Sequence, residues 1–220
     1  MRILERLYRS SFGRCMSFVA SILAKLHKPF MVYGFVDPET KTFRKYTRLS
    51  STVTIMNQNK LCIGDYAWVW HYSILDATEG ISIGEGCQIG AWVGIFTHGS
   101  ENSIRLLGRQ FVHVGNSERP GYTRGKVEIG PYSFVGAGSV ILPGTKIGKG
   151  CLIAAGAFVS GNVPDYSVVV GNPGVVKART VDRDRRFFRV KDFSETYYDQ
   201  EALAEIKKSL DAKPVTSEIK

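Results

Sequence analysis

Aliphatic residues recur at every sixth position along the middle of the chain. Cut from Ile63, the sequence reads IGDYAW, VWHYSI, LDATEG and, after a two-residue slip at Ile81-Ser82, IGEGCQ, IGAWVG, IFTHGS. Six further hexads follow from Ile129. The residue that opens each hexad is aliphatic throughout: Ile63, Val69, Leu75, Ile83, Ile89, Ile95, Ile129, Val135, Ile141, Ile147, Ile153 and Val159. An amphipathic helix has no such period, so the pattern predicts a repeat of short strands.

One hexad holds a short strand and a corner, so three hexads close a triangular coil. Stacked coils pair at a strand spacing of roughly 4.8 Å, which piles the opening aliphatics on one another inside. The fifth residue should also point inward near a corner, and it is compact in most hexads: Ala67, Ser73, Cys87, Val93, Ser133, Ser139, Thr145, Cys151, Ala157 and Val163, against Glu79 and Gly99. A glycine follows the opening residue in six hexads, which we attribute to backbone geometry that a Cβ would oppose. An antiparallel sandwich would show period two instead. The sequence therefore predicts an all-β, parallel β-helix.

The six-residue repeat has one long interruption, after Thr97-His98. Residues 99–126 intervene before the coil resumes near Val127. A solenoid can extrude such a loop only outward, and long structureless loops in compact folds are usually functional. This loop carries polar and aromatic side chains that suit a polar ligand: Arg105, Arg109, His113, Glu118, Arg119, Tyr122 and Arg124.

The two ends lie outside the repeat. Residues 1–28 have apolar side chains at helical spacing with arginines on the other face, which predicts a basic amphipathic helix. It can lie in a membrane interface, or pack on the β-helix or on a neighbouring subunit. Residues 29–179 form the predicted β-helix domain, entered through irregular strands with a turn at Asp37-Pro38-Glu39. Residues 180–220 form a tail with a short helix expected from Ser194, which could cap the open end of the solenoid.

Composition and charge narrow the class of protein. The 220 residues carry a net charge of +9, with a local +5 in residues 1–28 and again in 177–191, and no Lys or Arg in 63–98. Positive charge at the two ends argues against a nucleic-acid binder and for anionic phosphates or lipid headgroups. No apolar run approaches the roughly 20 residues of a membrane span, and we expect no secretory signal. The four cysteines have no CxxC spacing, so we expect them reduced, in the cytoplasm.

The repeat resembles that of the hexapeptide-repeat acyltransferase family over roughly residues 55–179. The closest likeness is to the branch of maltose, nodulation-factor and galactoside acetyltransferases. This resemblance implies a left-handed coil, acetyl-CoA as acyl donor, and a homotrimer with active sites between neighbouring β-helices. The family also contains γ-class carbonic anhydrases and noncatalytic solenoids, so the repeat is more specific for fold than for activity.

Acyl transfer to a hydroxyl needs a base, and neutral imidazole suits that role at cytoplasmic pH. The resemblance places the catalytic histidine before the large loop, where Thr97-His98 matches; from the residues alone, His98 could equally be a surface residue at a loop edge. Asp76, in SILDAT, matches an aspartate near the acceptor, where it could bind sugar hydroxyls, orient the base, or satisfy corner amides. We assign acceptor binding to Asp76, His71, Arg109 and Tyr122. His113 is expected to be a surface or supporting residue.

A zinc site is the alternative use of these histidines. The carbonic anhydrases of this architecture bind zinc through three histidines, two of them closely spaced. Here His71, His98 and His113 are 27 and 15 residues apart, and His113 lies in the loop. Three histidines can bind zinc, but this spacing does not match, so we predict no metal.

The donor side is predicted from the later coils. An extended pantetheine arm needs small residues so that its amides can approach the backbone. Gly136-Ala137-Gly138 and Ala154-Ala155-Gly156 provide them one coil apart, and in the family these positions contact coenzyme A; corner packing alone would also require them. The ending VVVGNPGVVKART resembles the family's closing signature and places Lys177 and Arg179 near the nucleotide phosphates. It departs from that signature at Gly174-Val175, which leaves the number of phosphate contacts open. The predicted donor residues are thus Ala137, Gly138, Ala155, Gly156, Lys177 and Arg179.

These features together predict an acetyl-CoA-dependent O-acetyltransferase with His98 as general base. The expected acceptor is a sugar or glycan hydroxyl, in biosynthesis of a surface polysaccharide such as O-antigen, capsule or exopolysaccharide. The expected place is the cytoplasm, with peripheral contact to the inner membrane as one role for residues 1–28. The alternatives are a xenobiotic or antibiotic O-acetyltransferase and a noncatalytic β-helix scaffold.

Overall fold

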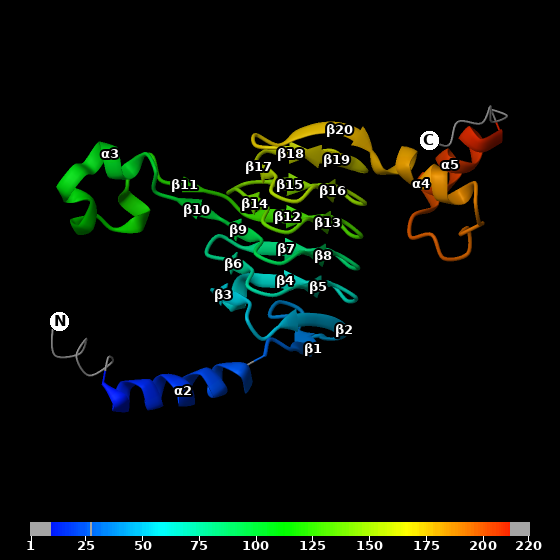
Figure 1. Cartoon of the computed structure of the whole chain (residues 1–220). Helices are drawn as coiled ribbons and strands as arrows, with labels where there is room; N and C mark the ends of the chain where they lie inside the picture. Colours follow the sequence, from blue (N-terminus) through cyan, green and yellow to red (C-terminus); the bar gives the residue numbers. More distant parts are fainter. Residues whose placement is uncertain (1–9, 27, 212–220) are drawn as a thin grey trace.

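The hexapeptide repeat folds as a parallel β-helix, in a computed structural model that describes residues 10–26 and 28–211 (Figure 1). Its walls, within those residues, are three sheets. Sheet A contains β1 (Met31–Val36), β2 (Phe43–Ser50), β5 (Trp68–Val69), β8 (Gln88–Ile89), β13 (Phe134–Val135), β16 (Leu152–Ile153), β19 (Ser167–Val170) and β20 (Val175–Arg179). Sheet B contains β3 (Thr54–Met56), β6 (Ile74–Asp76), β9 (Gly94–Phe96), β14 (Val140–Ile141) and β17 (Phe158–Val159). Sheet C contains β4 (Leu61–Ile63), β7 (Ile81–Ile83), β12 (Val127–Ile129), β15 (Lys146–Ile147) and β18 (Asn162–Val163).

The core is the stack of opening aliphatics that the sequence predicts. Each of the twelve is at most 3% exposed, and all lie in one continuous cluster inside the coil. The compact fifth residues, from Ala67 to Val163, are buried as well. Both predictions are confirmed, because the interior of a triangular coil has room for one aliphatic per wall and a compact group near each corner.

The coils have two lengths, on either side of the long interruption. Above it, Phe134 pairs with Leu152, eighteen residues on, as three hexads require. Below it, Trp68 pairs with Gln88 and Leu61 pairs with Ile81, so each lower coil has twenty residues. The two-residue slip seen once in the sequence therefore belongs to every lower coil, at the corner between sheets B and C.

The glycines after the opening residues serve a purpose other than the one predicted. Gly64, Gly84 and Gly136 do not have positive φ angles. Instead, a Cβ on Gly136 would lie 2.4 Å from the backbone nitrogen of Ala155 in the next coil. They are required because stacked backbones approach closely at the corners, and the left-handed backbone occurs two residues later, as at Gly138 (φ +70).

Replacing Gly136 by alanine should therefore destabilise the β-helix by about 1–3 kcal/mol, because the added methyl overpacks two backbones that cannot move apart independently. Urea unfolding at fixed protein concentration measures this. Gly115→Ala is the matched control: a Cβ there meets nothing within 4 Å, and we expect a change within about 0.5 kcal/mol. Equal midpoints for the two variants would refute the close-stacking explanation.

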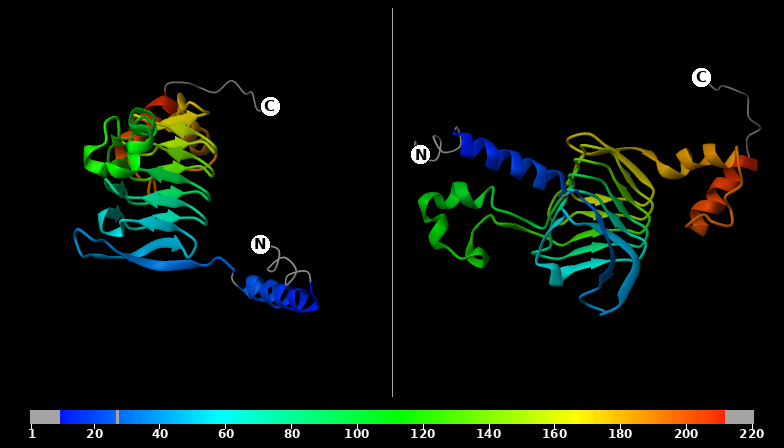
Figure 2. Two further views of the ribbon diagram at one scale, coloured as in Figure 1. Left: turned by 90° about the vertical axis from the view of Figure 1, so that its left-hand side faces the viewer. Right: turned by 60° about the horizontal axis from the view of Figure 1, so that its bottom comes forward.

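The N-terminal segment leads into the lowest coil. β1 and β2 form an antiparallel hairpin, and β2 then pairs in parallel with β5. Helix α2 (Ser11–Leu26) projects away from the lower end of the β-helix (Figures 1 and 2) and leaves Phe12 and Met16 more than half exposed. Residues 1–9 of the predicted helix, and His27 near its end, lie outside the described residues. None of the described helices is both long and apolar enough to cross a membrane.

The long interruption is an ordered extrusion rather than a structureless loop. Its ends pair with each other as the antiparallel strands β10 (His98–Gly99) and β11 (Thr123–Arg124). The intervening chain forms helix α3 (Ser103–Leu107) and the short 3-10 helices η2 (Gly108–His113) and η3 (Asn116–Glu118); a further one, η1 (Gln58–Lys60), precedes β4. Figure 1 shows the extrusion standing out sideways from the corner between sheets B and C.

The C-terminal tail contains two helices, α4 (Thr180–Phe188) and α5 (Gln200–Asp211). α5 begins at Gln200 and not at Ser194, because the side chain of Asp199 accepts a hydrogen bond from the backbone N–H of Ala202 (2.9 Å). Lys149 binds Asp199 at 2.8 Å and holds the tail beside the upper coils, not over the open end (Figure 1). Burial alone would raise the pKa of Asp199, but these two contacts, together with the neighbouring Tyr166, lower it to about 2.

Candidate functional site

His98 stands at the edge where sheet B ends and the extrusion begins. It follows the buried Thr97, opens β10, and pairs with Arg124 of the returning strand β11. Its side chain is 29% exposed. The rigid coil therefore fixes the backbone of this histidine while solvent or a ligand can still reach its ring.

Asp76 faces the imidazole from the coil below. It ends β6, in register with Phe96 at the end of β9, and it is almost fully buried. Its Oδ1 accepts hydrogen bonds from the backbone N–H (3.1 Å) and hydroxyl (2.6 Å) of Thr78. Its Oδ2 lies 2.8 Å from Nδ1 of His98. The two atoms are at ion-pair distance without hydrogen-bond alignment, and such contacts often tighten only when substrate binds.

This geometry suits the second of the three roles predicted for Asp76, orientation of the base. A carboxylate beside Nδ1 favours a proton on that nitrogen, which leaves Nε2 as the nitrogen able to accept one. A buried Asp–His contact of this kind is a general way to orient an imidazole for proton transfer.

Thr97 ties the corner together across two coils. It is fully buried; its hydroxyl donates to the carbonyl of Asp76 (2.8 Å) and accepts from the backbone N–H of Glu79 (2.9 Å). Sequence reasoning assigned no role to Thr97, Thr78 or Glu79. Their positions could have indicated a role, because all three lie at the corner that carries the extrusion.

The returning strand places an aromatic layer on the histidine. The Tyr122 ring stacks on His98 with centroids 5.7 Å apart and planes 11° from parallel. The guanidinium of Arg124 lies 4.7 Å from the centroid of the Tyr122 ring. Arg124 is itself fixed by an ion pair with Glu79 and by a hydrogen bond to the carbonyl of Asn116 (2.6 Å). Tyr122, predicted to bind the acceptor, is thus in direct contact with the candidate base.

A hollow of about 550 Å³ opens beside His98, on the outer face of sheet B. It is lined by Phe96, His98, Gly99, Glu101, Thr123, Leu142, Pro143, Phe158 and Ser160. Mostly apolar walls with a few polar groups are typical of sites for small organic ligands.

The predicted donor residues gather at the other edge of sheet B. Ala137, Gly138, Ala155 and Gly156 form the corner between sheets A and B, called here the small-residue corner, and all four are exposed. The backbone N–H of Gly156 donates to the carbonyl of Ala137 (2.9 Å), so the two turns stack directly. Gly138 and Gly156 have left-handed backbones with open space where a Cβ would be. A ligand can therefore approach the main chain there.

The two basic residues of the closing signature have different surroundings. Both lie on the exposed strand β20. Arg179 makes a bidentate ion pair with Glu205 of α5 (2.5 and 2.9 Å), and this hydrogen bonding raises its pKa. Lys177 makes no ion pair with any described residue. Lys177 is therefore the better placed of the two to meet an anionic ligand.

The remaining predicted residues lie apart from His98. His71 is at the corner between sheets A and B, where its Nδ1 is 2.6 Å from the hydroxyl of Ser50. Arg109 and His113 are exposed on η2, in the outer part of the extrusion. The structure thus brings together His98, Asp76 and Tyr122, and it places His71 with the small-residue corner. No cluster of three or more metal-ligating side chains occurs in the part of the chain that the structure describes.

Comparisons with known proteins agree on the repeat. Residues 126–161 match the profile described as bacterial transferase hexapeptide (six repeats), and residues 75–96 match the hexapeptide repeat of succinyl-transferase. A probable acetyltransferase from Mycobacterium tuberculosis is 30% identical over 56% of this chain and 39% of its own length. The galactoside O-acetyltransferase of Lactococcus lactis is 32% identical over 52% of this chain and 50% of its own length. The chain thus spans half or less of these two relatives.

The fold recurs among solved structures. A hexapeptide-repeat acetyltransferase from Vibrio cholerae superimposes with a TM-score of 0.52 at 20% identity, over 60% of this chain and 69% of the other. At that identity the likeness concerns the fold, and it supports the left-handed form of the β-helix.

Proposed function

The chain belongs to the hexapeptide-repeat acyltransferase family, and from this we propose that it transfers an acetyl group from acetyl-CoA to a hydroxyl of a sugar acceptor. The observation that carries the proposal is the Asp76–His98 pair, set at the root of the extrusion beside an apolar hollow. A noncatalytic scaffold has no need of a buried carboxylate beside a part-exposed imidazole.

His98 acts as the general base in this proposal. Its Nε2 accepts the proton of the acceptor hydroxyl while the oxygen attacks the thioester carbonyl. The new C–O bond forms, the C–S bond breaks, and the proton passes from His98 to the departing sulfur. Asp76 keeps Nδ1 protonated and stabilises the imidazolium between the two transfers. Tyr122 restricts rotation of the ring by stacking on it.

The donor is acetyl-CoA, which supplies the activated acyl group. Its pantetheine arm would run along the small-residue corner, where Gly138 and Gly156 leave the backbone open. Main-chain amides of the coils would bind its amides and the developing oxyanion. Lys177, exposed on β20, would meet the nucleotide phosphates.

The two halves of this site lie at opposite edges of sheet B in one chain. In each coil the chain runs through the corner between sheets A and B before the sheet B strand. It runs through the corner that carries His98 after that strand. A homotrimer would resolve the separation by bringing His98 of one chain to the small-residue corner of the next. The separation is thus a physical reason for the proposed homotrimer. The projecting helix α2 would then pack on a neighbouring subunit or rest on the membrane. We place the reaction in cytoplasmic assembly of a surface polysaccharide.

The test is release of free thiol from acetyl-CoA in the presence of single acceptors. Galactosides, glucosides and maltose are expected to support release, with the acetyl ester detected on the sugar by mass spectrometry. Chloramphenicol is the comparison acceptor. Turnover of chloramphenicol alone, or acetyl-CoA binding without turnover of any acceptor, would contradict the sugar assignment.

A further inference from the structure

A column of large side chains lies on the outer face of sheet A. Arg48, Trp68, Gln88 and Phe134 pair in sequence along β2, β5, β8 and β13, so they point outward one above the other. A hollow of about 320 Å³ lies along this column and is also lined by Trp70, Gly90, Ala91 and Ala137. The proposed chemistry uses none of these residues except Ala137.

Trp70 breaks the rule of the repeat at this hollow. It directly follows the opening residue Val69, a position that is Gly90, Gly136 and Ala154 in the next three coils above it. The indole adds nothing to the core, because it points outward and is 39% exposed. It lies against Trp68 with ring centroids 4.9 Å apart. A large aromatic side chain at a position that the repeat keeps small is more useful to a ligand than to folding.

Trp68 presents a polar group that lacks a partner. Its indole Nε1 is buried and has no hydrogen-bond acceptor among the described residues. The guanidinium of Arg48 lies 5.2 Å from its ring and helps to fix the indole in place. Buried donors are normally paired, and Trp68 lines the hollow, so a small shift of the indole would offer its unpaired Nε1 to an acceptor from outside the chain. The exposed amide of Gln88 adds a second polar group able to donate and accept.

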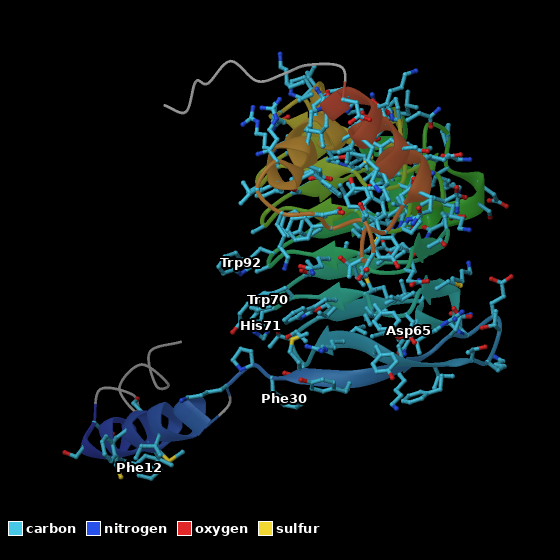
Figure 3. All side chains as sticks on the ribbon, turned by 90° about the vertical axis from the view of Figure 1, so that its right-hand side faces the viewer. Phe12, Phe30, Asp65, Trp70, His71 and Trp92 are labelled. Carbon is cyan, nitrogen blue, oxygen red and sulfur yellow. The ribbon has the colours of Figure 1, made fainter. Side chains whose placement is uncertain are left out.

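The hollow opens onto the small-residue corner, because Ala137 belongs to both. The same corner continues downward into Trp92, 66% exposed, whose ring stacks with Tyr72 (centroids 6.4 Å apart, planes 10° from parallel). Figure 3 shows Trp70, His71 and Trp92 along one edge of the molecule. A donor arm running down the corner from Lys177 would bring its acyl end toward this edge.

We propose that the hollow binds the acceptor sugar ring. The C–H face of a pyranose would lie against Trp70, one hydroxyl would accept the hydrogen bond of Trp68 Nε1, and others would meet Gln88. Flat aromatic walls with few, placed polar groups suit a ring that is apolar on its faces and polar at its rim. The inference deepens the proposed function and rests on it, since it supplies the acceptor for His98 of a neighbouring chain.

The kinetic test is Trp70→Ala in the thiol-release assay with methyl β-galactopyranoside and maltose. We expect the acceptor KM to rise about tenfold, which corresponds to about 1.4 kcal/mol, while the acetyl-CoA KM stays within about twofold. Trp70→Phe should restore most of the acceptor KM because it keeps a flat ring. Phe187→Ala, which removes an exposed aromatic from α4, is the matched control and should change neither constant.

Three outcomes would overturn the inference. An unchanged acceptor KM in Trp70→Ala would show that the indole does not contact the sugar. A rise in the acetyl-CoA KM instead would assign the hollow to the donor. Loss of the oligomer in light scattering would make the hollow a subunit contact.

A binding measurement separates this inference from the proposed function. The chain has three tryptophans, so in Trp92→Phe only Trp68 and Trp70 report by fluorescence. Titration with the two sugars should give a saturable change, and the double variant with His98→Ala should keep it. Saturable binding without any acetyl transfer would refute the proposed reaction and leave the sugar subsite standing. Transfer without a saturable change would refute the subsite alone.

Discussion

Replacing His98 by alanine is expected to lower kcat/KM for acetyl transfer by about 10²–10⁴-fold, the range that a positioned general base contributes. The loss follows from the proposed chemistry, since no other described side chain is at once held by a buried carboxylate and open to the hollow beside it. Steady-state thiol release with saturating acetyl-CoA measures it. The fold should survive, because the ring is part-exposed and outside the core.

His113→Ala is the matched control, since it removes the other histidine of the extrusion from an exposed position on η2. It should retain activity within about twofold. Circular dichroism and light scattering on both variants separate chemistry from folding. Full activity in His98→Ala would eliminate His98 as the base, and equal losses in both variants would point to the extrusion as a whole.

The substitution Asp76→Asn should cost about 10²-fold or more in kcat with a smaller change in the acetyl-CoA KM. Asparagine keeps an oxygen for the Thr78 contacts, but its NH₂ group can face Nδ1 and stabilise the opposite tautomer. The proton would then sit on Nε2, where the acceptor hydroxyl needs a lone pair. The expected signature is a fall in kcat, whereas loss of a sugar contact would mainly raise the acceptor KM.

Asp65→Asn supplies the control for replacing a carboxylate by an amide at a corner, where Asp65 is part-exposed. Asp65 accepts hydrogen bonds from the backbone N–H groups of Tyr46 (2.7 Å) and Tyr66 (2.9 Å), at the corner between sheets C and A. Its replacement should leave kcat within about twofold. If Asp76→Asn changed only the acceptor KM, Asp76 would be a sugar ligand, as the first of its predicted roles has it.

The interior of the β-helix could be predicted from the sequence because each coil repeats the same steric problem. Val69 and Ile89 occupy equivalent places, so one hexad describes its neighbours. The reason for the glycines could not be predicted in the same way. A positive φ and a close backbone neighbour both select glycine, and only the distance from Gly136 to Ala155 separates the two causes.

The candidate site could be predicted from the sequence only in part. With the two-residue slip in place, Asp76 stacks under Phe96, and His98 follows two residues later. The register could therefore suggest that Asp76 and His98 are neighbours, but not which oxygen faces the ring. Tyr122 returns through a non-repeating extrusion, so no periodicity could place it on His98. The sequence places Trp70 at a position that is glycine or alanine in the next three coils. Its proposed role in binding the sugar could not be predicted from the sequence, because that role depends on the hollow beside it.

The extrusion has a consequence for how such a protein can diversify. It enters and leaves through the paired strands β10 and β11, and the coil continues across it in register, with Gly94 beside Val140. The segment inserted between the two strands is therefore separable from the coil: residues 100–121 can be exchanged while the stem keeps the distance between its ends and Tyr122 stays stacked on His98. Grafting a different segment onto this stem should change which molecules are admitted to His98 and leave the coil's folding intact. In this architecture the chemistry and the selectivity can be inherited, or engineered, separately.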